Sequence, residues 1–237
     1  MIKSFKKLFA PDPSQSFHSN HYLRHTSRRL EHLASLAIPV EGKSVLELGA
    51  GIGDHTSFFL DRGCDVLATD SRETNRVVLQ ARYPQCKTMV LDLDEPVTQL
   101  KQKFDIVYAY GLLYHLAEPA AAVQRLANWT GGILLLETCV SPTAQGPNIV
   151  KEDRKNPTQA HCGTGCRPGR RWLYELLQTH FEHVYSTRTQ PRHLEFPLDW
   201  NTANDSHLTR AVFVCSRTPL NLPTLTRELN TVQLPQV

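Results

Sequence analysis

The sequence lacks the apolar segments that would place a chain in a membrane or export it. No apolar run reaches the roughly 18 residues that a membrane-spanning helix needs. The first 17 residues include lysines but no apolar core of roughly 7 to 15 residues, so we expect no secretory signal. Six cysteines in a chain without such a signal are expected to be free thiols. The sequence therefore predicts a cytoplasmic protein without a membrane partner.

The chain also lacks internal repeats and a strong charge of either sign. Its net charge of +3 is too small to indicate a nucleic-acid partner by itself. Basic residues gather in three short segments, residues 3–7, 24–29 and 167–171, which are compatible with an anionic partner. A length of 237 residues and a hydrophobic share of 41% suit one globular domain. Nothing in the sequence indicates the oligomeric state.

Apolar runs and helical patterns alternate along the first 140 residues. The runs are short and apolar on both faces, which predicts buried strands at residues 43–49, 64–70, 87–94, 104–110 and 133–138. Helical spacing and end signals predict helices between them, at residues 54–61, 74–83 and 119–129. This alternation predicts an α/β fold with a doubly wound, mostly parallel sheet and helices on both faces.

The flanking segments follow other patterns. Residues 19–36 have helical spacing, residues 141–168 have no period and predict a long functional or mobile loop, and residues 170–179 predict a helix. Two β-rich runs, 182–189 and 209–217, predict a hairpin added to the sheet. We therefore divide the chain into an N-terminal segment with a lid-like helix (1–42), a main domain (43–218) and a C-terminal tail (219–237).

The stretch "SVLELGAGIGDHT", residues 44–56, joins the first predicted strand to the next helix. A dinucleotide site has G-x-G-x-x-G here, so that a pyrophosphate can lie at the helix N-terminus. In this chain the third glycine comes one position early, and Glu47 stands two residues before Gly49. A carboxylate at that place suits a bound cation better than a bound phosphate.

"VLELGAGIG" resembles the signature of class I S-adenosylmethionine-dependent methyltransferases, whose cofactor carries a sulfonium and an ammonium. The resemblance covers residues 43–137 and implies a seven-stranded sheet in the order 3-2-1-4-5-7-6, with the seventh strand antiparallel. It also implies that Asp70 binds the ribose hydroxyls and that Asp92 binds the adenine amino group with help from the next backbone N–H. The implied cofactor-binding residues are Glu47, Gly49, Ala50, Gly51, Asp70, Ser71, Asp92, Leu93, Tyr110 and Tyr22.

Two other interpretations of the same turn stay open. NAD-dependent oxidoreductases also place an acid after the second strand, so Asp70 alone does not separate the two cofactors. The glycines also suit a tight turn that has no role in ligand binding. This interpretation leaves three acids at three consecutive strand ends unexplained. Tyr22 also has two possible roles. It either contacts the cofactor or only packs within its helix.

The segment "YAYGLLYHLAEP", residues 108–119, follows the fourth predicted strand. By the resemblance, Tyr110 lies along the methionine part of the cofactor, and Tyr114 and His115 face the acceptor. A histidine with a pKa near neutrality suits a general base there. His115 is therefore the candidate catalytic residue. Its alternative role is to orient the loop by hydrogen bonding. Glu137, at the end of the fifth predicted strand, is a second candidate base.

The same segment also limits the class of acceptor that we expect. It lacks the Asn/Asp-Pro-Pro-aromatic pattern of enzymes that methylate planar amide or exocyclic nitrogens, but some tRNA wobble-modifying relatives have a similar "LYH" turn. We expect methyl transfer from S-adenosylmethionine to an oxygen or nitrogen of a small molecule, such as a natural product or a sugar. The alternatives are modification of tRNA or protein, a cofactor-binding subunit without catalysis, and an NAD-dependent oxidoreductase.

The loop "QAHCGTGCRPGRRW", residues 159–172, contains possible metal ligands in His161, Cys162 and Cys166. The spacing C-x3-C is looser than in zinc sites, and no fourth ligand follows at a suitable distance, so we expect no metal. The glycines favour a loop folded over the site. Arg167, Arg170 and Arg171 are then expected to face an acidic acceptor or a helix end, with a solvated basic face as the alternative.

Overall fold

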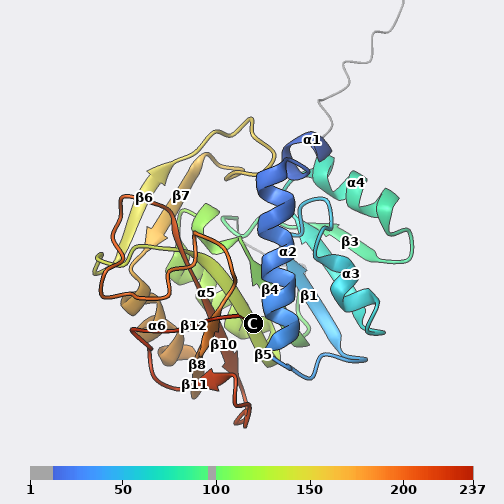
Figure 1. The fold of residues 1–237 in the computed structure, drawn as a ribbon. Coiled ribbons are helices and arrows are strands. Elements are labelled where there is room, and N and C mark those ends of the chain that lie inside the picture. Colours follow the sequence, from blue (N-terminus) through green and yellow to red (C-terminus); the bar gives the residue numbers. More distant parts are fainter. Residues whose placement is uncertain (1–12, 96–99, 237) are drawn as a thin grey trace, which may run out of the picture.

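The computed structural model describes residues 13–95 and 100–236, so the basic segment at residues 3–7 lies outside the described residues. An eight-stranded sheet forms the centre of the molecule (Figure 1). Its spatial order is β11-β8-β10-β5-β4-β1-β2-β3. No helix in the described ranges is long and apolar enough to cross a membrane.

The five predicted parallel strands are present and pair in the predicted order. They are β1 (Ser44–Leu48), β2 (Asp65–Asp70), β3 (Lys87–Val90), β4 (Phe104–Tyr110) and β5 (Thr130–Val140). The predicted hairpin is formed by β8 (His183–Thr187) and β10 (Thr209–Ser216), and β10 runs antiparallel to β5. The order 3-2-1-4-5-7-6 is thereby confirmed. An eighth strand, β11 (Leu225–Thr226), extends the sheet beyond β8.

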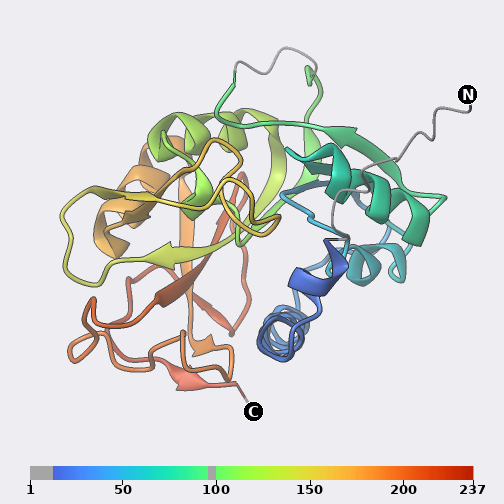
Figure 2. The ribbon, with the colours of Figure 1, turned by 90° about the horizontal axis from the view of Figure 1, so that it is seen from above.

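Helices cover both faces of the sheet. α2 (Asn20–Ser35), α3 (Thr56–Leu60) and α4 (Glu73–Arg82) pack against one face through residues such as Leu33, Phe59 and Leu79. α5 (Pro119–Trp129) and α6 (Arg170–His180) cover the other face. Figure 2 shows α2 end-on, across the sheet from α5 and α6. Successive strand residues such as Ile106 and Val107 belong to opposite cores, as a doubly covered sheet requires.

The predicted loop at residues 141–168 is partly wrong, because β6 (Pro147–Lys151) and β7 (Thr164–Pro168) form an antiparallel ladder within it. Four of the five residues of β6 are exposed, so the apolar alternation that reveals a half-buried strand is missing. The remaining short elements are α1 (Ser14–Phe17), the 3-10 helix η1 (Leu113–His115), β9 (Thr189–Gln190) and β12 (Leu234–Pro235). The segment from residue 219 onward supplies β11 and β12, which pair with β8 and β9.

Candidate active site

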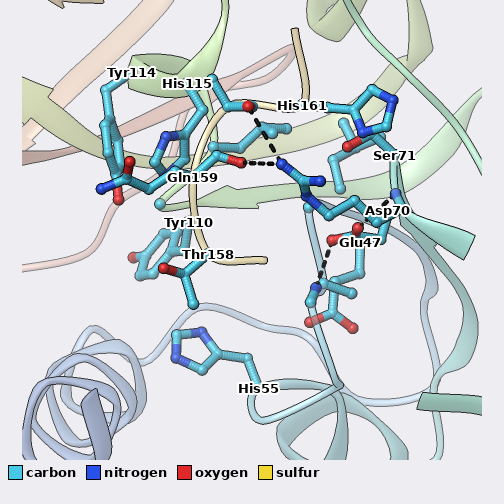
Figure 3. A pocket seen from close by; sticks show the side chains of 18 of the residues that line it. Glu47, His55, Asp70, Ser71, Tyr110, Tyr114, His115, Thr158, Gln159 and His161 are labelled. Atoms are coloured by element: carbon cyan, nitrogen blue, oxygen red, sulfur yellow. Dashed lines mark hydrogen bonds between the residues drawn. The ribbon is translucent and has the colours of Figure 1, made fainter. Parts of the chain in front are cut away.

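A cavity of about 1100 Å³, including its open mouth, lies at the carboxyl ends of β1, β2 and β4. This is the edge at which parallel α/β sheets bind ligands. Its walls come from α1, α2, the three strand ends, η1, residues 157–161 and β10 (Figure 3). All eleven residues named above as cofactor-binding or catalytic line it: Tyr22, Glu47, Gly49, Ala50, Gly51, Asp70, Ser71, Asp92, Leu93, Tyr110 and His115.

The turn after β1 holds its backbone open toward the cavity. Gly49 and Gly51 have φ angles of 65° and 58°, in the left-handed region that favours glycine. A Cβ atom at Gly49 would lie 2.9 Å from Leu112 Cδ1, and one at Gly51 would lie 2.8 Å from Phe17 Cε1. The backbone conformation therefore favours glycine at these two positions, and any other residue would also displace the Leu112 or Phe17 side chain.

Glu47 is a buried carboxyl group beside this turn, with 1% of its surface exposed. Its Oε2 accepts a hydrogen bond of 2.7 Å from Thr56 Oγ1. Burial raises the pKa of Glu47 to about 7, because the charged form loses its hydration. Oε1 accepts no hydrogen bond from the described residues, so this oxygen is available to a positively charged group in the cavity.

Asp70 is held rigidly at the end of β2. Its Oδ2 accepts from the backbone N–H of Gly51 (2.9 Å), and its Oδ1 accepts from the backbone N–H of Arg72 (2.8 Å) and from Asn75 Nδ2 (3.1 Å). Burial raises its pKa, and these three donors offset only part of the effect. An ionised carboxyl group has about four acceptor sites, which leaves room for a hydroxyl donor from a ligand.

Two further predicted residues line the same cavity from different sides. Asp92 follows β3, and its Oδ1 accepts a hydrogen bond from the backbone N–H of Asp94 (3.0 Å). Tyr110 ends β4, and its buried hydroxyl has no hydrogen-bond partner within residues 13–95 and 100–236. A buried hydroxyl without a partner is uncommon in folded proteins, so Tyr110 is a group that a bound ligand would satisfy.

His115 forms a pair with Glu152, a residue that the sequence analysis did not identify. His115 Nδ1 lies 2.5 Å from Glu152 Oε2, and Glu152 also accepts from the backbone N–H of Ala160 (2.8 Å). Burial lowers the pKa of His115, and the opposing effect of Glu152 offsets only part of this. Burial would raise the pKa of Glu152, but His115 and other partners hold it below its ordinary value. The pair is therefore a carboxylate that accepts from a neutral imidazole, whose Nε2 carries the free lone pair.

Glu137 does not fit the role of a second base. It is 0% exposed and is not among the residues that line the cavity. Its two oxygens accept from Arg29 Nη1 (2.8 Å) and from Arg210 Nη1 (3.0 Å). Burial acts to raise the pKa of Glu137, but the two arginines outweigh it and hold the pKa below its ordinary value. A carboxylate fixed between two guanidinium groups is a poor proton acceptor, so that sequence-based suggestion is wrong.

One wall of the cavity carries a guanidinium group from β10. Arg210 lines the cavity, and its Nη2 donates to the hydroxyl of Tyr114 (3.3 Å). Among the described residues, three of its five N–H groups are used, by Glu195, Glu137 and Tyr114, so two remain for a ligand. The sequence analysis missed Arg210, although an arginine inside an otherwise apolar strand run, "TRAVFVCS", is a signal for such a role.

Residues 157–161 line one side of the cavity, so only the first three residues of the loop at 159–172 lie over the site, and its glycine-containing part does not line the cavity. Arg72 Nη2 donates to the carbonyl groups of Gln159 (3.2 Å) and Ala160 (3.3 Å). Asn75 Nδ2 donates to the carbonyl of Pro157 (3.1 Å) and also to Asp70. The loop is therefore tied to the residues that surround the Asp70 carboxylate.

The possible metal ligands and the arginines of the loop at residues 159–172 lie in different surroundings. His161 lines the cavity, whereas Cys162 is exposed and Cys166 is buried with its thiol donating to the carbonyl of Leu113. None of the three loop arginines lines the cavity, so the first alternative, an acidic acceptor, is wrong, and the alternative of a solvated basic face holds for Arg171. Arg167 contacts Glu152, Arg170 lies over the ring of Trp200, and Arg171 is solvated beside Glu175.

Comparison with known proteins places the chain among methyltransferases. A profile of the family described as "Methyltransferase domain" matches residues 19–194. A tRNA U34 carboxymethyltransferase from Hydrogenovibrio crunogenus is 32% identical over 137 residues, which cover 52% of this chain and 39% of that protein. A phosphoethanolamine N-methyltransferase from Triticum aestivum is 33% identical over 135 residues, covering 53% of this chain and 26% of that protein. The chain therefore spans only a minor part of these curated relatives.

Solved structures show the same fold. The N-terminal domain of EvdMO1 with SAH bound superposes with a TM-score of 0.65 at 20% identity, covering 84% of each chain. Magnesium protoporphyrin IX methyltransferase from Synechocystis PCC 6803 with bound SAM gives 0.56 at 17% identity, covering 84% of this chain and 82% of that one. The family match over most of the chain, on a sheet of this order, shows that the protein belongs to the methyltransferase-domain family and has the class I S-adenosylmethionine-dependent methyltransferase fold.

Proposed function

We propose that this protein binds S-adenosylmethionine in the cavity at the ends of β1, β2 and β4 and catalyses transfer of its methyl group. The observation that carries the proposal is the convergence of Glu47, Asp70 and Asp92 on one cavity beside a turn whose glycines have left-handed φ angles. Glu47 suits the cationic methionine part, Asp70 the ribose hydroxyls and Asp92 the adenine. The unpartnered hydroxyl of Tyr110 suits the polar methionine end.

The role of the bound cofactor is to supply a methyl group on a sulfonium, which is already a good leaving group. The protein then has to orient the acceptor and keep water out, which is catalysis by proximity. Residues 157–161, held by Arg72 and Asn75, close one side of the cavity against water. We also propose that α2, through Tyr22 and Arg29, acts as a lid from the N-terminal segment (1–42) on a catalytic domain at 43–218.

We propose His115 as the general base for an acceptor that must lose a proton. Glu152 fixes the proton of the imidazole on Nδ1, so Nε2 is the atom that accepts. The lowered pKa keeps the imidazole neutral at pH 7, and the carboxylate of Glu152 stabilises the imidazolium once the proton has moved. A positioned base of this kind contributes roughly a hundred- to ten-thousand-fold.

We propose a small anionic molecule as the acceptor, methylated on an oxygen or a nitrogen. Arg210 lines the cavity, two of its N–H groups have no partner among the described residues, and a guanidinium group suits a carboxylate or a phosphate. The relative from Triticum aestivum is named for phosphoethanolamine, which is a small anionic molecule. A tRNA acceptor is the second candidate, because another relative of similar identity is named for tRNA U34.

The direct test is turnover by the purified full chain. S-adenosylmethionine is incubated with phosphorylated amines, with carboxylated phenols or with bulk tRNA, and formation of the demethylated product is measured. Turnover with the first or second group supports the proposal, and turnover with tRNA alone supports the second candidate. Cofactor binding without turnover on any acceptor would favour a non-catalytic cofactor-binding subunit. In that case His115→Ala should also leave cofactor affinity unchanged.

A further inference from the structure

A second group of titratable side chains lies where α2 meets the segment after β9. His21 and His25 are one helical turn apart on α2, and His193 and Glu195 are two residues apart in the facing segment. The imidazole rings pack together, with centroids 4.9 Å apart for His25 and His193 and 5.6 Å apart for His21 and His193. We refer to these four residues as the histidine cluster. The cofactor roles proposed above use none of them.

The donor atoms of the histidine cluster lie at distances that suit a metal ion. One ligand atom from each of His25, His193 and Glu195 lies within 4.8 Å of the others. His25 Nε2 is 3.6 Å from Glu195 Oε2, and His21 Nε2 is 3.4 Å from Glu195 Oε1. Zinc with bonds of roughly 2.0 to 2.1 Å in a tetrahedral site places its ligand atoms roughly 3.3 to 3.4 Å apart. The distances of 3.4 and 3.6 Å are close to this value and run to the two different oxygens of Glu195, which places His21 and His25 on the two sides of its carboxylate.

A buried nitrogen without a partner points to a missing ligand. His25 is 2% exposed, and within the described residues its Nε2 has no hydrogen-bond partner. A buried polar atom is almost always satisfied in a folded protein. Within the described residues, the unpartnered Nε2 of His25 is therefore an atom that a bound metal ion would satisfy.

The surroundings of the histidine cluster support a metal site. Arg210 Nε donates to Glu195 Oε2 (2.6 Å), which orients the carboxylate in the way that outer hydrogen bonds orient metal ligands. Glu137 pairs with Arg29 and Arg210, and Glu195 pairs with Arg210. His193 Nδ1 accepts only a long hydrogen bond of 3.3 Å from the backbone N–H of Glu195, which coordination would replace.

We propose that His21, His25, His193 and Glu195 bind one divalent transition-metal ion, with zinc favoured by the nitrogen-rich set of donors. The ion links α2 to the segment at residues 193–195. Because His25 and Arg210 also line the cavity, the ion fixes the side of the cavity that α2 forms. The sequence-based expectation of no metal considered only the loop with His161, Cys162 and Cys166, and it overlooked these histidines because two distant segments supply them.

The test uses the full chain, freed of any affinity tag, stripped with a chelator and titrated with zinc or with cobalt as a visible probe. One equivalent of zinc is expected to bind, and Co²⁺ to give the intense visible absorption of a four-coordinate site. His21→Ala and His193→Ala, both at positions with solvent exposure, are expected to weaken zinc binding at least tenfold. His207→Ala, in an exposed loop, and Cys162→Ser are matched controls that should leave it unchanged.

Hydrogen exchange gives a second result that does not depend on enzyme activity. Zinc is expected to slow exchange in α2 of the wild-type chain and to have no such effect in His193→Ala. Zinc binding as strong in His21→Ala and His193→Ala as in the wild type would overturn the proposal, as would absence of binding to the folded wild-type chain. Loss of binding in Cys162→Ser alone would place the ion in the loop and equally overturn it. A failed methyl-transfer assay would not bear on these measurements.

Discussion

Replacing Glu47 with Gln should stabilise the free protein while weakening its cofactor binding. The pKa of Glu47 is raised from its ordinary value of 4.5 to about 7 in the folded chain. Between these values the folded state binds more protons than the unfolded state, so this group lowers stability as the pH rises. A difference of about 2.5 pKa units corresponds to about 3 kcal/mol, which is fully expressed above pH 7.

Glu47→Gln removes the buried charge but keeps an oxygen that can accept from Thr56. We therefore expect the variant to be more stable than the wild type by up to about 3 kcal/mol at pH 8, and by less than about 1 kcal/mol at pH 5. Urea denaturation at the two pH values measures both differences. Glu41→Gln, at an exposed position before β1, is the matched control and should change stability at neither pH.

The same variant should bind S-adenosylmethionine at least tenfold more weakly at pH 8, which is about 1.4 kcal/mol. The reason is that a bound cation stabilises the ionised form of Glu47 and is attracted by its negative charge. The neutral amide of the Glu47→Gln variant provides no such attraction. For the wild type, affinity should therefore fall as the pH drops below about 7. Equal cofactor affinity in the two proteins, together with a variant less stable than wild type at pH 8, would refute the reasoning.

Three further predictions concern the rest of the cavity. Asp70→Ala should weaken cofactor binding at least tenfold by calorimetry, about 1.4 kcal/mol, and unchanged affinity would remove Asp70 from the site. His115→Ala should lower kcat at least a hundredfold with little change in cofactor affinity, and full activity of the variant would end its role as base. For the wild type, kcat should fall as the pH drops through a value below 6.5, because the pKa of His115 is lowered. Arg72→Ala should speed hydrogen exchange in residues 157–161, since it removes two hydrogen bonds to that loop, and unchanged exchange would show that other contacts hold it.

Much of the fold followed from local patterns in the sequence. The parallel strands are buried on both faces, so each appears as a continuous apolar run, and their order followed from the family resemblance. β11 and β12 escaped prediction because a two-residue strand has no alternation to detect. The β6–β7 ladder escaped because most of β6 faces solvent, which removes the apolar signal.

The cofactor side of the site was accessible from sequence because each of its acids ends a predicted strand. Glu47 and Asp70 are placed by the strands themselves, and parallel strands bring their carboxyl ends to one edge. Glu152 and Arg210 were not accessible in this way. They meet His115 and Tyr114 across 37 and 96 positions of sequence, and no local pattern encodes a contact between such distant segments.

The most direct test of the central claim is calorimetric titration of the purified chain with S-adenosylmethionine, its demethylated product and NAD. The account predicts micromolar binding of the first two and no binding of NAD, because Glu47 disfavours a pyrophosphate and attracts a cation. Binding of NAD without binding of S-adenosylmethionine would contradict it, and would mean that the glycine turn after β1 serves a dinucleotide.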